Sequence, residues 1–378
     1  ISGGNDPYTT WGTRSKGIRF VFGYETVSID SPNYGKYFWE EWNKGKTFKY
    51  AFLDASWRIS TGQAPALVAF GSNSADAVAR RDNERLLYAG SVSNNWGAWS
   101  WYNARSASFT TAAEALTTAS RLGTPGNVDV VSRGNSNDEV SEIAEAFGIQ
   151  LPDESAIKAR PTDIKMVRTD AADLVVEKNG NFELIFKNEG EEKATGDVLA
   201  DDTLIARAQE LAGQLSFLDG QTLRVGMIRD LNENTGAEGF QNEAQVTEKT
   251  IVLDQTVNDT PFIDPEAGHL EITFGARSGQ LKRVRNTLKA ITISKVEGQT
   301  ASAQPMSLEE ARQSAMAAFG QAADSNAAMV SSALVAAESE AVGYQMIDGQ
   351  AVLVYRALIS SSAAPGMRPF QAIIPLVK

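Results

Sequence analysis

The side chains that could do chemistry in this 378-residue chain are few in kind, because it has no cysteine and one histidine, His269. The absence of cysteine excludes a thiolate nucleophile and thiolate metal ligands within the chain. A serine nucleophile needs an adjacent base, and no GxSxG turn lies near His269. We therefore expect His269 to be structural or at the surface.

Paired carboxylates can do acid–base chemistry without histidine. Glu40 and Glu41 lie between Trp39 and Trp42. Neighbours on a helix diverge by about 100°, so these two carboxylates cannot face one substrate together. Asp54, close to Trp57, is a further candidate. We favour an ordinary helix surface with half-buried tryptophans.

The stretch DLNENTGAEG resembles a calcium loop, with oxygen ligands at Asp230, Asn232 and Asn234. Its glycine, Gly236, comes one position late, and the twelfth position is Gln241 rather than glutamate. We therefore favour a polar hairpin loop without a metal.

An aromatic cluster, NNWGAWSWYN, offers a binding surface at Trp96, Trp99, Trp101 and Tyr102. Trp99 and Trp101 alternate as on a strand, so one face could stack on sugar rings or on another protein. Packing in a core is the favoured interpretation. The sequence has no Walker loop, nicotinamide fingerprint or zinc spacing, so we expect no cofactor.

The net charge of −12 repels phosphate backbones, so we expect no nucleic-acid partner. No stretch approaches the roughly 18 apolar residues that a membrane span needs. The chain begins with Ile1 and not with methionine, so we expect either that a leader or upstream segment has been removed or that the given sequence simply starts at this residue.

The elements expected in the first third alternate as in a layered α/β domain. Strands are predicted at 17–24 and 64–71, and helices at 31–43, 47–59, 74–87, 111–122 and 136–147. Capping boxes start the last two helices, at Thr111 with Glu114 and at Ser136 with Glu139.

After residue 163 the chain becomes rich in strands. Asn179-Gly180 predicts the turn of a hairpin over 173–186. Helices are predicted at 204–215 and from Ser307, and strands at 222–228, 250–256, 269–274, 282–293, 351–359 and 370–377. We therefore expect an α/β domain at 1–150, a linker at 151–163, and two α+β units of a helix on an antiparallel sheet at 164–298 and 305–378.

The first hundred residues resemble an uncharacterised bacterial and archaeal family with a caspase–haemoglobinase-like fold. The matching pieces are GIRFVFGYET, YGKYFWEEWNKGKTFKYAFLDASW, QAPALVAFGS and NERLLYAGSVSNNWGAWSWY. The two later units look like PepSY modules, and TPFIDPEAGHLEITFGARSGQLKRV is the best piece. Caspase-like peptidases carry a His-Gly histidine and a cysteine upstream of the matched segment, and this chain contains neither. The resemblance therefore implies a fold and not an activity.

These observations favour a secreted or surface-exposed protein without catalytic activity in this chain, which binds a protein partner or assembles with itself. We expect Arg19–Phe22 to be an inner strand of a caspase-like sheet, with Gly23 at its carboxyl end. Ligands of open α/β sheets bind at that end, so Tyr24, Glu25, Thr26 and Asp54 should rim any cleft. One alternative is the carboxyl-terminal part of a caspase-like peptidase whose histidine and cysteine lie upstream of Ile1. Another is polysaccharide binding through residues 94–103.

Overall fold

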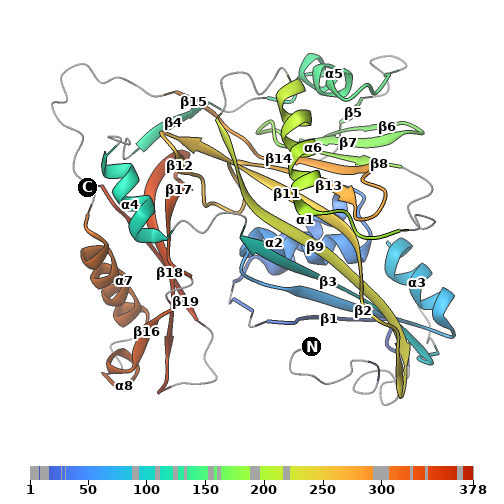
Figure 1. Cartoon of the computed structure of the whole chain (residues 1–378), viewed down its shortest axis with the longest axis horizontal. Coiled ribbons are helices and arrows are strands. Elements are labelled where there is room, and N and C mark those ends of the chain that lie inside the picture. Colours follow the sequence, from blue (N-terminus) through green and yellow to red (C-terminus); the bar gives the residue numbers. More distant parts are fainter. Residues whose placement is uncertain are drawn as a thin grey trace.

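A computed structural model describes most of the chain, namely residues 8, 17–26, 28–29, 31–86, 93–106, 111–121, 127–131, 134–151, 157–159, 163–187, 196–215, 222–292, 306–323, 327–336, 339–363 and 369–377. Across these ranges the fold is mixed α/β, with two antiparallel sheets and eight helices (Figure 1). The helices are α1 (Tyr34–Asn43), α2 (Phe48–Ile59), α3 (Ser74–Asn83), α4 (Ala112–Arg121), α5 (Asn137–Ala146), α6 (Asp201–Gln214), α7 (Leu308–Ala322) and α8 (Ala327–Ser331).

The larger sheet joins strands from both halves of the chain. Its order is β1 (Phe20–Tyr24), β2 (Pro65–Gly71), β3 (Trp96–Ser106), β9 (Leu223–Ala237), β11 (Gln245–Val257), β13 (His269–Gly275), β14 (Leu281–Asn286), β8 (Phe182–Phe186), β7 (Ala172–Val176), β6 (Lys165–Arg168) and β5 (Lys158–Ala159). Two short strands, β10 (Phe240–Gln241) and β12 (Thr260–Pro261), pair with β9 and β11. The long strands β3, β9 and β11 connect the amino-terminal part to the strands that follow.

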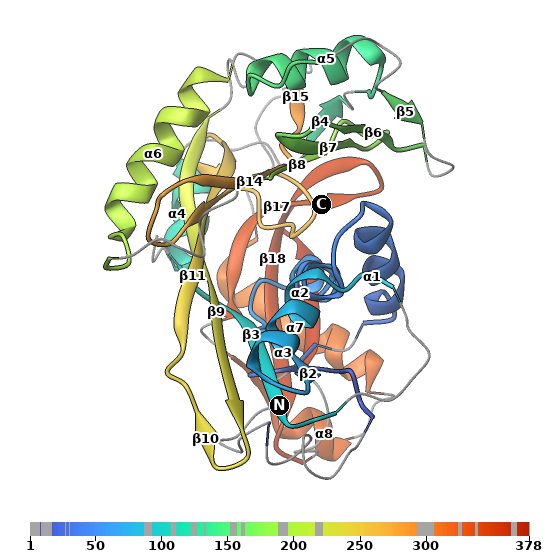
Figure 2. The same ribbon diagram turned by 90° about the vertical axis from the view of Figure 1, so that its right-hand side faces the viewer.

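The central strands of this sheet have one apolar face and one charged face. Ile251, Ile272 and Val284 belong to an apolar core with Leu204 and Ala208 of α6. Successive side chains of a strand point to opposite faces, so the alternate positions face away from α6. Figure 2 shows α6 on one side of β9 and β11, and α1, α2 and α3 on the other. The helices α1 and α2 therefore lie over the charged face.

The smaller sheet has the order β15 (Ala290–Thr292), β4 (Asn127–Val131), β18 (Gln350–Ser361), β16 (Ala333–Val335), and both β17 (Ala341–Ile347) and β19 (Phe370–Pro375) pair with β18. Ala311, Ala315 and Phe319 of α7 are spaced four residues apart, lie on one face of the helix and pack in the core of this sheet. Leu116 of α4 lies in the same core. Thus α4 and β4 pack with the end of the chain.

The prediction that Arg19–Phe22 forms an inner strand is wrong. β1 is the first strand in the sheet order among the described strands, and it pairs antiparallel with β2, with Phe22 opposite Leu67. A continuous apolar run shows that a strand has covered faces, but it does not give the order of strands. β1 and β2 pair antiparallel, whereas a caspase-like sheet would have two parallel strands side by side at this position.

The predicted capping boxes and the predicted hairpin are confirmed, but the helix start predicted at Ser31 is wrong, because α1 begins at Tyr34 with Asn33 as its N-cap. Both hydrogen bonds of a capping box are present at Ser136 with Glu139 and at Ser307 with Glu310. Thr111 and Glu114 also exchange hydrogen bonds. β7 and β8 pair across the Asn179-Gly180 turn, where Gly180 has a φ of 76° that favours glycine.

The predicted division of the chain into domains stays a prediction. Most of the linker at 151–163 lies outside the described residues, as does the segment 299–304 between the two predicted α+β units. Lys158–Ala159 forms β5 and pairs with β6. Strands from 20–106 and from 223–286 share one sheet, so backbone hydrogen bonds connect the first two predicted domains.

Candidate functional site

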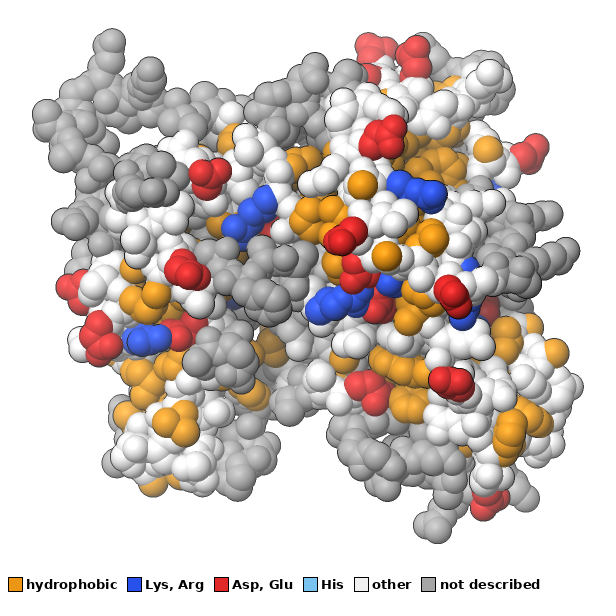
Figure 3. Space-filling view, in the orientation of Figure 1, with side chains coloured by type: hydrophobic (Ala, Val, Ile, Leu, Met, Phe, Trp, Pro, Cys, Tyr) orange, Lys and Arg blue, Asp and Glu red, His pale blue; other side chains and the backbone are white. Residues whose placement is uncertain are grey.

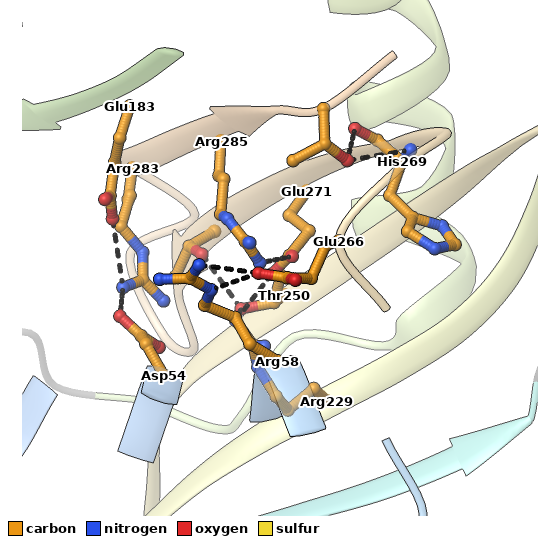
Figure 4. A network of polar contacts seen from close by, with 12 residues as sticks. Asp54, Arg58, Glu183, Arg229, Thr250, Glu266, His269, Glu271, Arg283 and Arg285 are labelled. Carbon is orange, nitrogen blue, oxygen red and sulfur yellow. Dashed lines mark hydrogen bonds and ion pairs between the residues drawn. The ribbon is translucent and has the colours of Figure 1, made fainter. Parts of the chain in front are cut away.

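The most distinctive polar feature is a network of buried ions between α2 and the charged face of the large sheet (Figure 4). At its centre, Asp54 of α2 accepts hydrogen bonds from Lys46 Nζ at 2.7 Å, Arg283 Nη1 at 2.6 Å and the Tyr102 hydroxyl at 2.7 Å. Burial acts to raise the pKa of Asp54, but the charges of Arg283 and Lys46 outweigh it and hold the pKa well below its ordinary value. Asp54 is therefore a fixed anion.

Lys46 is a buried cation in this network with three carboxylate partners. Its Nζ lies 2.5 Å from Glu41, 2.7 Å from Asp54 and 2.7 Å from Glu183, and its side chain is 1% exposed. Burial would lower the pKa of Lys46, but the three surrounding carboxylates raise it. The carboxylates therefore favour the charged form of Lys46.

Strands of the large sheet contribute the other ions of the network, and some of these residues lie directly opposite one another on neighbouring strands. Arg285 lies directly opposite Glu271 on β13 and opposite Glu183 on β8. Its Nη1 donates to Glu271 at 2.6 Å, and Arg229 Nη2 of β9 lies 3.0 Å from the same carboxylate. The Arg229 guanidinium also lies between the rings of Trp57 and Tyr102, 4.7 and 4.4 Å from their centroids.

Arg58, at the end of α2, connects the network to the surface. Its guanidinium contacts Glu40 at 2.8 Å, Glu41 at 2.9 Å and Glu266 at 2.5 Å. Beside it is a polar cavity of about 230 Å³, lined by residues that include Tyr37, Glu177, Asn181, Arg285 and Thr287. That volume is below the roughly 300–1,000 Å³ of small-molecule sites.

A wider hollow of about 780 Å³ lies between α2, α3 and the strands β9, β11 and β14. Its volume is in the range of ligand sites. Its inner cations are engaged within the protein, because Lys49 contacts Asp82 and Glu233, and Arg81 contacts the same two carboxylates. The Tyr50 hydroxyl donates to Glu248 at 2.9 Å.

His269 is held by two oxygen acceptors. Its Nδ1 lies 2.9 Å from Asp254 Oδ1, and its Nε2 lies 2.5 Å from the carbonyl oxygen of Asp264. Because a carbonyl accepts only, Nε2 must carry a proton, and the carboxylate favours a proton on Nδ1 as well. Burial acts to lower the pKa of His269, but the hydrogen bond and charge of Asp254 outweigh it and raise the pKa. Both ring nitrogens of His269 are thus engaged within the protein, and its imidazolium form is favoured.

The surroundings of Asp254 are shaped to hold this pair. A Cβ built on Gly226 would lie 1.9 Å from Asp254 Oδ2, so only glycine leaves room for the carboxylate. Asp264 in turn accepts from the backbone N–H of Met346 in β17, at 2.9 Å. Asp264 thus links the His269 site, on inner strands of the larger sheet, to β17 of the smaller sheet.

The residues predicted to rim a cleft are not brought together. Tyr24 reaches Ser56 of α2 with a hydroxyl contact of 2.9 Å, and Thr26 Oγ1 accepts from Ala64 N. Partial burial raises the pKa of Glu25 to about 6, and the nearby Trp99 side chain acts more weakly to lower it. Asp54 lies in the buried network, 4% exposed.

The predicted aromatic surface is divided between the two faces of β3. Trp99 and Trp101 share one face, with ring centroids 4.7 Å apart, and both are partly buried. Tyr102 points to the other face and packs against Trp57. The ring centroids of Trp96 and Phe240 are 6.1 Å apart. The alternation of side chains along a strand correctly predicted that Trp99 and Trp101 share a face. The same alternation directs Tyr102 to the other face, where it bonds Asp54 of the buried network.

The prediction that Asp230 to Gly239 forms a polar hairpin loop is wrong for most of its length, because Leu223–Ala237 forms β9, and the alternative calcium loop is therefore not formed there either. Asp230, Asn232 and Asn234 occupy alternate positions of this strand and pair opposite Asn103, Trp101 and Trp99 of β3. The ligand atoms of a calcium loop must converge, whereas these side chains follow one another along a strand. Among the described residues no group of three or more His, Cys, Asp or Glu side chains could hold a metal ion.

Sequence reasoning missed Lys46, Glu183, Arg229, Glu271 and Arg283. The available signal was a charged residue inside an apolar strand, as in FELIF, HLEITFG and LKRVRN. Such residues are rarely buried unless they are paired. Their partners are distant in sequence, so the pairing itself could not be predicted.

No protein-family model matches this chain, and the search of curated proteins gives no match. No described helix combines the length and apolar character needed to cross a membrane.

Proposed function

We propose that this chain is a binding or assembly protein rather than a catalyst, and that it acts outside the cell or at its surface. The observation that carries the proposal is the engagement of His269. With Nδ1 facing a carboxylate and Nε2 facing a carbonyl, the imidazole has no lone pair to accept a proton from a nucleophile. Asp54, with three donors and a lowered pKa, is a poor base.

The surface supports binding at one place in particular. Phe22 is 41% exposed and Trp39 is 48% exposed, and both belong to a group of touching aromatic rings at the β1 end of the sheet. Exposed aromatic patches on soluble proteins commonly mark interaction sites. On the face in Figure 3, acidic and basic side chains are interspersed, without a large region of one sign.

The caspase-like and PepSY-like resemblances remain part of this proposal, as an account of how the two parts of the chain are related to other proteins. Only general features of the fold support these resemblances. Three helices lie on one face of β1–β3, and α6 and α7 pack on antiparallel sheets. The antiparallel pairing of β1 with β2 counts against a parallel caspase-like core. The proposed binding function does not depend on the resemblance.

The peptidase alternative depends on sequence outside this chain. It requires a His-Gly histidine and a cysteine upstream of Ile1, and reading the gene upstream tests it directly. Their presence there would favour a peptidase precursor.

Polysaccharide binding is the second candidate, and one observation favours it. Trp99 and Trp101 are partly exposed on one face of β3, with ring centroids 4.7 Å apart. Neighbouring aromatic rings of this kind can stack on sugar rings. Affinity electrophoresis through a panel of polysaccharides would show retardation that Trp101→Ala abolishes and the control Trp39→Ala does not.

The experiment that tests the main proposal is a turnover assay on residues 1–378 with peptide libraries and glycoside substrates. We expect no turnover by the wild type. Turnover that is lost in Asp54→Asn or Glu25→Gln would show carboxylate catalysis and overturn the proposal. Turnover lost in His269→Gln would overturn the structural assignment of the imidazole, and Lys178→Met, at an exposed turn, controls for nonspecific loss.

A further inference from the structure

His269 connects the larger sheet to the segment that leads into its own strand, and we call residues 262–268 the connecting segment. On the sheet side, Nδ1 lies 2.9 Å from Oδ1 of Asp254, the residue directly opposite on β11. On the other side, Nε2 lies 2.5 Å from the carbonyl oxygen of Asp264. Only the imidazolium has an N–H for each acceptor, because a neutral imidazole has a single N–H. Loss of one proton therefore leaves a ring lone pair facing an oxygen atom at one of the two contacts.

The connecting segment also binds the smaller sheet. Phe262 forms a parallel bridge with Tyr344 of β17 and packs in the core of the smaller sheet. Ile263 N donates to Tyr344 O at 2.8 Å, and Asp264 Oδ2 accepts from Met346 N at 2.9 Å. Figure 1 shows β12, which precedes this segment, beside β17. Asp264 is thus in contact with both the imidazole and β17.

We propose that His269 is a pH-sensitive switch between the two sheets. As an imidazolium it holds the connecting segment against the larger sheet, in the position from which the segment binds β17. As a neutral imidazole it releases Asp264 and weakens this attachment of the smaller sheet. The switch is independent of the proposed binding function.

The contact with Asp264 is the one that deprotonation breaks. A hydrogen bond to a carboxylate is charge-assisted and stronger than one to a neutral carbonyl. The remaining proton therefore stays on Nδ1, where it faces Asp254. Nε2 then directs its lone pair at the Asp264 carbonyl oxygen, and the repulsion between them moves the connecting segment away from the ring.

The charges around the imidazole place this change above the ordinary pKa of histidine. Besides Asp254, the charged groups in its surroundings are the side chains of Asp264, Glu266, Glu271, Arg224 and Arg356. Burial acts to lower the pKa of His269, but Asp254, the carbonyl of Asp264 and the charge of Glu271 raise it. The two guanidinium groups oppose the imidazolium by like charge without reversing this shift. The proton is therefore lost above about pH 6.5.

NMR titration of residues 1–378, prepared without a histidine tag, tests the first step. The chain has one histidine, so a single imidazole Cε1–H signal reports its protonation. We expect a midpoint between about pH 6.5 and about pH 9 in the wild type. Asp254→Asn, which has the same shape, should lower the midpoint because it replaces the charged acceptor by an amide. A wild-type midpoint at or below about pH 6.5, or an imidazolium that persists at about pH 9, would overturn the switch.

Amide hydrogen exchange at about pH 6 and about pH 9 then measures the attachment of the connecting segment, as protection factors that remove the intrinsic pH dependence of exchange. The amides of Ile263 and Met346 in the wild type should lose protection about tenfold or more at the higher pH. In Asp254→Asn they should keep it, because a neutral imidazole can then donate from Nε2 to Asp264 and accept at Nδ1 from the asparagine amide. Amides of β7, several strands from β11 in the sheet order, are the internal control.

Two results of the exchange experiment contradict the switch. Equal protection of Ile263 and Met346 at both pH values in the wild type would show that the connecting segment does not respond to the proton on His269. A loss of protection that persists in Asp254→Asn, or that extends equally to β7, would assign the effect to another titrating group or to global opening. The wild-type titration and exchange decide the question even where Asp254→Asn does not fold.

Discussion

Replacing Lys46 by methionine removes the cation that contacts Glu41, Asp54 and Glu183 and leaves the other buried ions in place. Methionine is similar in length and apolar, so the main change is in charge and not in volume. Removing one partner from a buried ion pair typically costs about 3–5 kcal/mol, because the remaining charge is uncompensated. A domain is stable by only about 5–15 kcal/mol. We therefore expect Lys46→Met to be folded but severely destabilised.

Differential scanning calorimetry measures this loss. An unfolding entropy of about 2.1 cal/mol/K per residue gives about 0.8 kcal/mol/K for 378 residues unfolding together, so the melting temperature should fall by about 4–6 °C. Lys178→Met is the control, because Lys178 forms a pair with Asp163 in which both side chains are exposed. Exposed pairs contribute about 0–1 kcal/mol, so this variant should melt within about 1 °C of the wild type.

A double variant separates charge balance from lost packing. Glu183 contacts Lys46 at 2.7 Å and Arg283 at 3.5 Å. Adding Glu183→Gln to Lys46→Met removes one negative charge along with one positive charge. We expect the combined loss to be smaller than the sum of the single losses by about 0.5–3 kcal/mol, as for directly coupled residues. A Lys46→Met loss no larger than that of Lys178→Met, or strict additivity, would refute the network as a stabilising unit.

Three further predictions concern other parts of the molecule. The pKa of His269 is raised in the folded protein, so its charged form stabilises the fold fully below the unfolded pKa of about 6.5, and this stabilisation is lost as pH rises through the folded pKa. The difference in melting temperature between the wild type and His269→Gln should therefore shrink with rising pH. A difference that stays constant with pH would contradict this. A Cβ at Gly97 would lie 2.2 Å from the Tyr8 ring, so Gly97→Ala should cost about 1–3 kcal/mol by urea unfolding, and a similar cost in a Tyr8→Ala background would show that the clash is not its cause. Because Asp230 and Asn232 lie along β9, EDTA should not shift the melting temperature, whereas removal of calcium bound at 100 times its Kd would remove about 2.7 kcal/mol.

The features that the sequence predicted are those set by neighbouring residues. Capping boxes need a serine and a glutamate three residues apart, and the Asn179-Gly180 turn needs only itself and its flanking strands. Alternation placed Trp99 and Trp101 on one face because a strand fixes that geometry wherever it lies. The contacts of His269 with Asp254 and Asp264 were not predicted, because no local pattern connects these residues.

The features that the sequence did not predict depend on partners far along the chain. The segment from Asp230 to Gly236 has the composition of a loop, but β3 and β11 pair with it on both sides and hold it as a strand. β1 has the apolar composition of an inner strand, yet its position at the end of the sheet is decided by what pairs with β2. The contact between Asp54 and Arg283 joins residues 229 positions apart, and no local pattern encodes it.

The buried network also offers a physical reason why the strands adopt one register. A slip of one residue moves every side chain of a strand to the opposite face. For β14 that would turn Arg283 and Arg285 toward α6 and place Val284 among the carboxylates. Each misplaced ion would then lie in an apolar core without a partner, at a cost of several kcal/mol. In a sheet with two apolar faces the same slip would exchange one hydrophobic side chain for another. The charged face therefore penalises every odd-numbered slip of β14 against β13 and β8, and it does so without any catalytic role for its carboxylates.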